Sequence, residues 1–119
     1  PKKAETETWN GTNWTEVNDL NTAREALSGA GASNTAALAF GGSTPPISAL
    51  TELWNGTNWT EVNDLNTARS TMAGGGTSTS ALTFGGSSPS VTAITELWNG
   101  TNWTEVGDLN AARKQLHQL

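Results

Sequence analysis

A sixteen-residue segment occurs three times in this chain, and this repetition limits the possible folds more than any other feature. Residues 9–24 read WNGTNWTEVNDLNTAR, and the same letters return unchanged at 54–69. A third copy at 98–113, WNGTNWTEVGDLNAAR, differs from the first two at two positions. The copies start 45 and then 44 residues apart. Because a fixed period of this length is the signature of repeat architectures, we expect each repeat to form one unit that packs on its neighbours.

The composition of the repeat favours strands over helices. Thr, Gly, Asn, Ser and Trp are weak helix formers, and no long apolar stripe with the helical period is present. Short strands bounded by turn residues are predicted instead. They lie at 36–40, 80–84, 94–98 and 102–106, with strands of small residues at 26–31 and 71–75. This makes four strands per repeat, and four strands every 45 residues is typical of a β-propeller blade.

The two spacers between the copies differ in length by one residue, and the difference lies before the Gly-Gly doublet of each. Turns accept insertions more easily than strands do. The extra residue is therefore predicted to lie in a turn, near 33–36 in the first spacer and 77–80 in the second.

All six tryptophans of the chain belong to the string WNGTNW. Asn-Gly between strand-like flanks predicts a hairpin, with either a two-residue turn or a four-residue connection. Both turns bring the two tryptophans of a string close together, where each pair buries a large apolar area. We expect packing roles within and between blades, and the alternative is an exposed ligand platform. The residues are Trp9, Trp14, Trp54, Trp59, Trp98 and Trp103.

The order of these features resembles a kelch repeat. The doublets Gly41–Gly42 and Gly85–Gly86 match the Gly-Gly that closes the second strand of that family, and the tryptophan pairs take the place of its paired aromatic residues. The segment DLNTAR at 64–69 resembles the family's loop that ends in Arg. The chain departs from the pattern because it has no Tyr and because its aromatic pair is closer than usual. The resemblance implies blade turns at the four glycines and a propeller of four-stranded blades, but no single function.

If the blade boundaries are placed as in a kelch repeat, the chain contains about two and a half blades. A stack of this size cannot close a ring alone, so we expect a homo-oligomer. Two chains give about five blades and three give seven or eight, and the alternative is a fragment of a longer propeller. The predicted units are a half-blade of outer strands at 1–24, full blades at 25–69 and 70–113, and the start of a further inner strand at 114–119.

One arginine and several carboxylates recur in each repeat. We expect Arg24, Arg69 and Arg113 to form buried ion pairs with carboxylates such as Glu52 and Glu96, which tie neighbouring strands together. The alternative is a carboxylate-lined site for a cation or a sugar in each blade. The spacing demonstrates no convergent set of oxygen ligands, so no metal site is predicted.

Charge and composition narrow the function classes. A net charge of −5 disfavours nucleic-acid binding, and no apolar run is long enough to span a bilayer. No signal peptide pattern is visible, and the sequence does not indicate the cellular compartment. The chain has no Cys and one His, so we expect neither catalysis nor a cofactor. The prediction is a non-enzymatic structural or interaction protein, with itself and a carbohydrate or protein ligand as partners. The alternative is a multivalent, lectin-like propeller.

Overall fold

The computed structural model describes residues 3–88 and 90–111, which form ten β-strands and no helix. The strands are β1 (Thr6–Trp9), β2 (Trp14–Val17), β3 (Ser28–Ser33), β4 (Ala36–Phe40), β5 (Thr51–Trp54), β6 (Trp59–Val62), β7 (Ala73–Thr77), β8 (Ser80–Phe84), β9 (Thr95–Trp98) and β10 (Trp103–Val106). This confirms the all-β prediction. The predicted tail strand at 114–119 lies outside the described residues.

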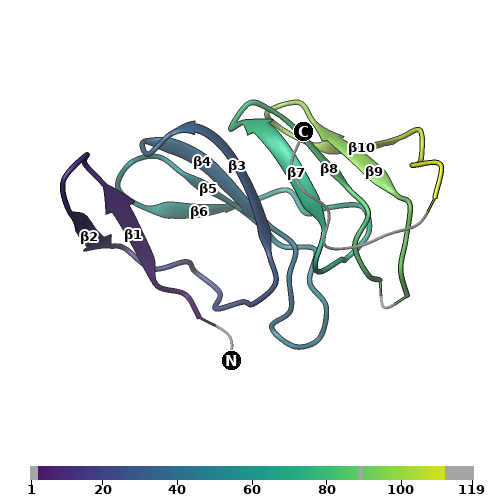
Figure 1. Ribbon diagram of the computed structural model, residues 1–119, viewed down its shortest axis with the longest axis horizontal. Coiled ribbons are helices and arrows are strands. Elements are labelled where there is room, and N and C mark those ends of the chain that lie inside the picture. Colours follow the sequence, from purple (N-terminus) through teal and green to yellow (C-terminus); the bar gives the residue numbers. More distant parts are fainter. Residues whose placement is uncertain (1–2, 89, 112–119) are drawn as a thin grey trace.

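The strands form three antiparallel sheets that stand side by side (Figure 1). The first sheet holds β1 and β2, the second holds β3 to β6, and the third holds β7 to β10. Each four-stranded sheet is a meander, because every strand pairs with the next one along the chain. The innermost strands of the second and third sheets, β3 and β7, pack against each other. The architecture is therefore a stack of two blade-like sheets and one two-stranded sheet.

Each WNGTNW string forms a hairpin with a four-residue connection. In the first one, Trp9 pairs directly with Trp14 across the two strands. The Asn10 side-chain oxygen accepts hydrogen bonds of 2.8 Å from the backbone N–H groups of Thr12 and Asn13. The next residue, Gly11, has a φ of 98°, which L side chains rarely adopt. The same contacts recur in the other two hairpins. They explain why both Asn and Gly are needed in the turn.

The extra residue of the first spacer lies in a strand and not in a turn, so this prediction was wrong. The turns between β3 and β4 and between β7 and β8 each contain two residues. The register of β3 against β4 shifts between Gly31 and Ser33, which is a β-bulge. A bulge absorbs one residue in one strand and leaves the partner strand unchanged.

The backbone of each Gly-Gly doublet lies very close to a backbone segment that links two sheets. Gly41 and Gly42 have φ values of 71° and 96°, and Gly85 and Gly86 have 72° and 95°. The Gly42 N–H donates to the Arg69 carbonyl at 2.7 Å, and a Cβ at Gly41 would lie 2.7 Å from the same oxygen. Only glycine fits both the backbone angle and the space.

The main hydrophobic core lies between the second and third sheets. It contains large side chains from both sheets, among them Phe40 and Trp103, whose rings meet edge to face at 5.0 Å. The first sheet contributes nothing to this cluster of buried residues. The largest members are Leu38, Phe40, Leu65, Met72, Trp98 and Trp103.

Candidate functional site

Three kinds of polar contact that join neighbouring sheets are each made twice within the chain. The first junction links the first and second sheets, and the second junction links the second and third. Each junction combines a buried ion pair, a tryptophan hydrogen bond and an asparagine contact. The nearly identical repeats place the same donors and acceptors at both junctions for these three contacts.

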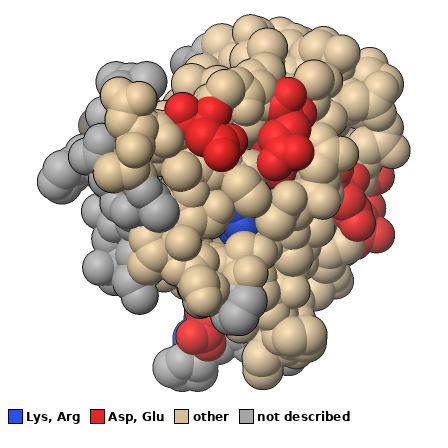
Figure 2. Space-filling model, turned by 90° about the vertical axis from the view of Figure 1, so that its right-hand side faces the viewer, with Lys and Arg blue, Asp and Glu red and all other residues tan. Residues whose placement is uncertain are grey.

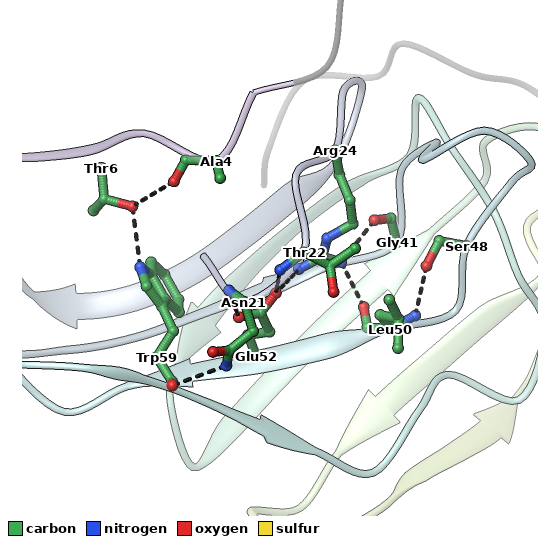
Figure 3. Close-up of polar contacts among 10 residues, drawn as sticks. All are labelled: Ala4, Thr6, Asn21, Thr22, Arg24, Gly41, Ser48, Leu50, Glu52 and Trp59. Atoms are coloured by element: carbon green, nitrogen blue, oxygen red, sulfur yellow. Dashed lines mark hydrogen bonds and ion pairs between the residues drawn. The ribbon is translucent and has the colours of Figure 1, made fainter. Parts of the chain in front are cut away.

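A buried arginine crosses each junction. The Arg24 backbone is bridged to Lys3 of the segment before β1, while its side chain enters the second sheet. There Nη2 lies 3.1 Å from the Glu52 carboxylate, and Nη1 donates to the Gly41 and Leu50 carbonyls at 2.8 and 2.7 Å (Figure 3). The pair therefore ties neighbouring sheets.

The second junction has the same ion pair. Arg69 Nη2 lies 2.9 Å from the Glu96 carboxylate, and all four side chains of the two pairs have no exposed surface. Burial lowers the pKa of Arg69, and the Glu96 carboxylate opposes this shift. Because the ordinary pKa of arginine is so high, the side chain stays cationic at neutral pH. Arg113, the third arginine predicted for such a pair, lies outside the described residues.

Each buried glutamate also accepts backbone hydrogen bonds from the segment before the arginine. The Asn21 and Thr22 N–H groups donate to the two Glu52 oxygens at 2.7 and 3.3 Å (Figure 3). The equivalent groups of residues 66 and 67 donate to Glu96 at the same distances. Together with the arginine, these N–H groups give each buried carboxylate three hydrogen-bond donors, which offset the cost of removing the charge from water. The ion pairs therefore serve the structure, and their carboxylates are already occupied.

A tryptophan hydrogen bond lies beside each ion pair. The Trp59 indole N–H donates to Thr6 Oγ1 at 3.0 Å across the first junction. The Trp103 indole N–H donates to Thr51 Oγ1 at 3.0 Å across the second, where its ring also meets Phe40. Thus the second tryptophan of the second and third hairpins donates to the first threonine of a strand in the preceding sheet, β1 or β5.

An asparagine of the first repeat and one of the second each contact the following hairpin turn. Asn18 Nδ2 donates to the Thr57 carbonyl and to Asn58 Oδ1, both at 2.7 Å. Asn63 Nδ2 donates to the equivalent groups of residues 101 and 102 at 2.8 and 2.7 Å. The third repeat has Gly107 at this position. Sequence reasoning missed these asparagines, although the change to glycine in the third copy was a visible signal.

The two faces of each sheet differ, because successive side chains in a strand point to opposite sides. The face that we call the tryptophan face carries Glu96, Trp98 and Trp103 in the third sheet, and it contacts the second sheet. The opposite face, which we call the threonine face, carries the side chains in register with Thr95. In the third sheet these are Leu82, Phe84, Thr95, Leu97 and Val106.

Among residues 3–88 and 90–111, one face of each kind has no neighbouring sheet at the two ends of the stack. The first sheet has its tryptophan face free, where Trp9 and Trp14 are 45% and 64% exposed. The threonine face of the third sheet is exposed in part: Phe84 and Thr95 are buried, whereas Leu97 and Val106 are 41% and 39% exposed. These are four of the five large apolar side chains that are exposed within 3–88 and 90–111. In contrast, Trp54, Trp98 and Trp103 are buried.

A pocket of about 240 Å³ lies on the free threonine face of the third sheet. It is lined by Leu82, Phe84, Thr95, Gly107, Asp108 and Leu109. Figure 2 looks at this side of the molecule, where mostly uncharged side chains surround a hollow with a basic side chain at its bottom and acidic side chains beside it. Within the repeat, these residues correspond to those around Trp103 at the second junction, where Leu38, Phe40, Thr51 and Leu65 lie.

The free tryptophan face also carries a glutamate at the position of the buried ones. Glu7 aligns with Glu52 and Glu96 in the repeat, yet it is exposed. It lies beside Trp14 in a shallow pocket of the first sheet. The first sheet thus presents the half of a junction that carries the glutamate and the tryptophan pair.

The described part of the chain, residues 3–88 and 90–111, contains no candidate metal site. No three His, Cys, Asp or Glu side chains gather there in a way that could hold a metal ion. The same residues include no helix of the length and apolar character needed to cross a membrane. No protein-family model and no curated protein matches the sequence.

Proposed function

We propose that the chain is a non-enzymatic structural and interaction protein whose copies associate head to tail into a closed, kelch-like ring. One observation carries this proposal. The two free faces at the ends of the stack are the two halves of an interface that the chain makes twice within itself. A second copy of the chain supplies the missing half at each end.

The two free faces are different, so their association is heterologous. Such contacts form rings when the rotation between copies closes and filaments when it does not. Two or three copies give about five or about seven to eight blades, and known propellers have about four to eight. The exposed Trp9 and Trp14 of one copy and the exposed Leu97 and Val106 of the next would then be covered together.

The burial of the tryptophans also bears on the lectin-like alternative. A sugar platform in every blade needs exposed indole rings, and Trp54, Trp98 and Trp103 are buried. The recurring carboxylates Glu52 and Glu96 already accept hydrogen bonds from an arginine and from backbone N–H groups. Self-assembly is therefore the function that the geometry supports best.

The mass of the protein in solution tests this proposal. Light scattering on a sizing column, over a dilution series, is expected to give one discrete mass of two or three times the 12.4 kDa chain. The discrete mass follows from closure, which leaves no free face for further growth. A monomer at every concentration would overturn the proposal. A mass that grows continuously with concentration would replace the ring with a filament.

A further inference from the structure

We infer that Trp14 of one copy fills the pocket on the third sheet of the next copy, and that Gly107 keeps this contact weaker than the junctions within the chain. The inference rests on the assembly proposed above and adds to it the residues that make the contact. Its two parts rest on different observations, one on the pocket and one on the missing asparagine.

The pocket has the chemistry of a tryptophan site. At the second junction, the Trp103 indole donates to the Thr51 hydroxyl at 3.0 Å and meets the Phe40 ring edge to face. In the third sheet, Thr95 and Phe84 hold the corresponding positions, and both line the pocket. The site therefore offers a hydroxyl acceptor next to an aromatic ring, which suits an indole with one polar N–H.

Trp14 is the indole that fits this site. It occupies the same place in its repeat as Trp103, and both follow the same hairpin sequence. Trp103 is 4% exposed, whereas Trp14 is 64% exposed. Buried tryptophans in pockets are the residues that most often dominate the binding energy of a protein interface. The same docking that buries Trp103 within the chain thus buries Trp14 between copies.

Gly107 removes one contact from the junction between copies. Asn18 and Asn63 each donate two hydrogen bonds to the next hairpin turn. The third repeat has glycine at this place, so the equivalent acceptors of a second copy, the Thr12 carbonyl and Asn13 Oδ1, receive no such bond. A Cβ at Gly107 would meet nothing within 4 Å. An asparagine therefore fits at 107 without strain.

Two variants with opposite effects test the inference, with the dissociation constant measured by sedimentation equilibrium. Gly107→Asn is expected to tighten self-association about tenfold, because it restores two hydrogen bonds. Gly107→Ala is the matched control, since it adds a Cβ without an amide, and it is expected to change the constant less than about twofold. Trp14→Ala is expected to weaken association by about thirtyfold or more.

The outcomes separate this inference from the proposed ring. If the wild-type chain assembles and neither Gly107→Asn nor Trp14→Ala changes the dissociation constant by more than about twofold, the inference is overturned while the ring stands. If the wild-type chain and Gly107→Asn are both monomeric at every concentration, the inference and the proposed ring are overturned together. Because Trp14 is largely exposed, circular dichroism of Trp14→Ala is expected to show an unchanged fold.

Discussion

Replacing Arg69 with methionine is expected to lower the free energy of unfolding by about 3–5 kcal/mol, because the change leaves a buried carboxylate without its cation. Arg69 and Glu96 have no exposed side-chain surface, and their closest atoms are 2.9 Å apart. The Asn66 and Thr67 N–H groups still reach Glu96, but they carry no formal charge. Urea unfolding at a fixed protein concentration measures the effect.

Two further variants make this result specific to the ion pair. Replacing both Arg69 and Glu96 with methionine is expected to recover much of the loss, since a packed apolar pair has no charge to desolvate. Lys3→Met is the exposed control, because Lys3 and Glu5 are 3.8 Å apart with side chains 70% and 57% exposed. It is expected to change stability by less than about 0.5 kcal/mol. A loss below about 1 kcal/mol in Arg69→Met would show that the pair does not hold the junction.

Truncating Trp103 to alanine is expected to cost about 3–5 kcal/mol, because it opens a cavity in the core between the second and third sheets. Trp103 is 4% exposed, packs on Phe40 and donates to Thr51. Its loss also leaves the Thr51 hydroxyl without this donor. Thermal and urea unfolding both report the change.

The repeat provides a matched control for this prediction. Trp14→Ala is the same substitution in the same sixteen-residue sequence, at a side chain that is 64% exposed. Below the concentration at which copies associate, it is expected to cost less than about 1 kcal/mol. Similar losses in the two variants at high dilution would contradict the packing role that separates them.

The sequence predicted the local structure well because local structure depends on local residues. The period, the strands and the hairpins at WNGTNW all follow from propensity and turn chemistry, which the repeats share. The choice of the four-residue connection was left open, and it depends on the Asn10 side chain bonding two backbone N–H groups. The bulge near Gly31 was missed, because a strand absorbed a residue that turns more often accommodate.

The burial of individual residues could not be predicted from the repeats. Trp14 and Trp103 lie in nearly identical sequences, yet one is exposed and the other is in the core. The difference comes from whether a neighbouring sheet covers the tryptophan face, which no local pattern encodes. The same holds for Glu7, which is exposed, and Glu52, which is fully buried. The sequence predicted that the ion pairs join neighbouring strands. The structure shows that they join neighbouring sheets, which the repeat pattern alone does not indicate.

Cross-linking between copies tests most directly whether a third junction repeats the two inside the chain. The chain has no cysteine, so only the introduced thiols react with the linker. The pair Asn63→Cys with Asn102→Cys is the internal control, because these side chains meet at 2.7 Å across the second junction. A short thiol-specific linker is expected to join them without changing the mass on a denaturing gel.

The test pair is Gly107→Cys with Asn13→Cys, which occupies the equivalent positions on the two free faces. The head-to-tail ring predicts links between chains that end in one covalent band of two or three chains. If the control pair reacts fully and the test pair remains a single chain at concentrations where the protein is assembled, the third junction does not exist in this form.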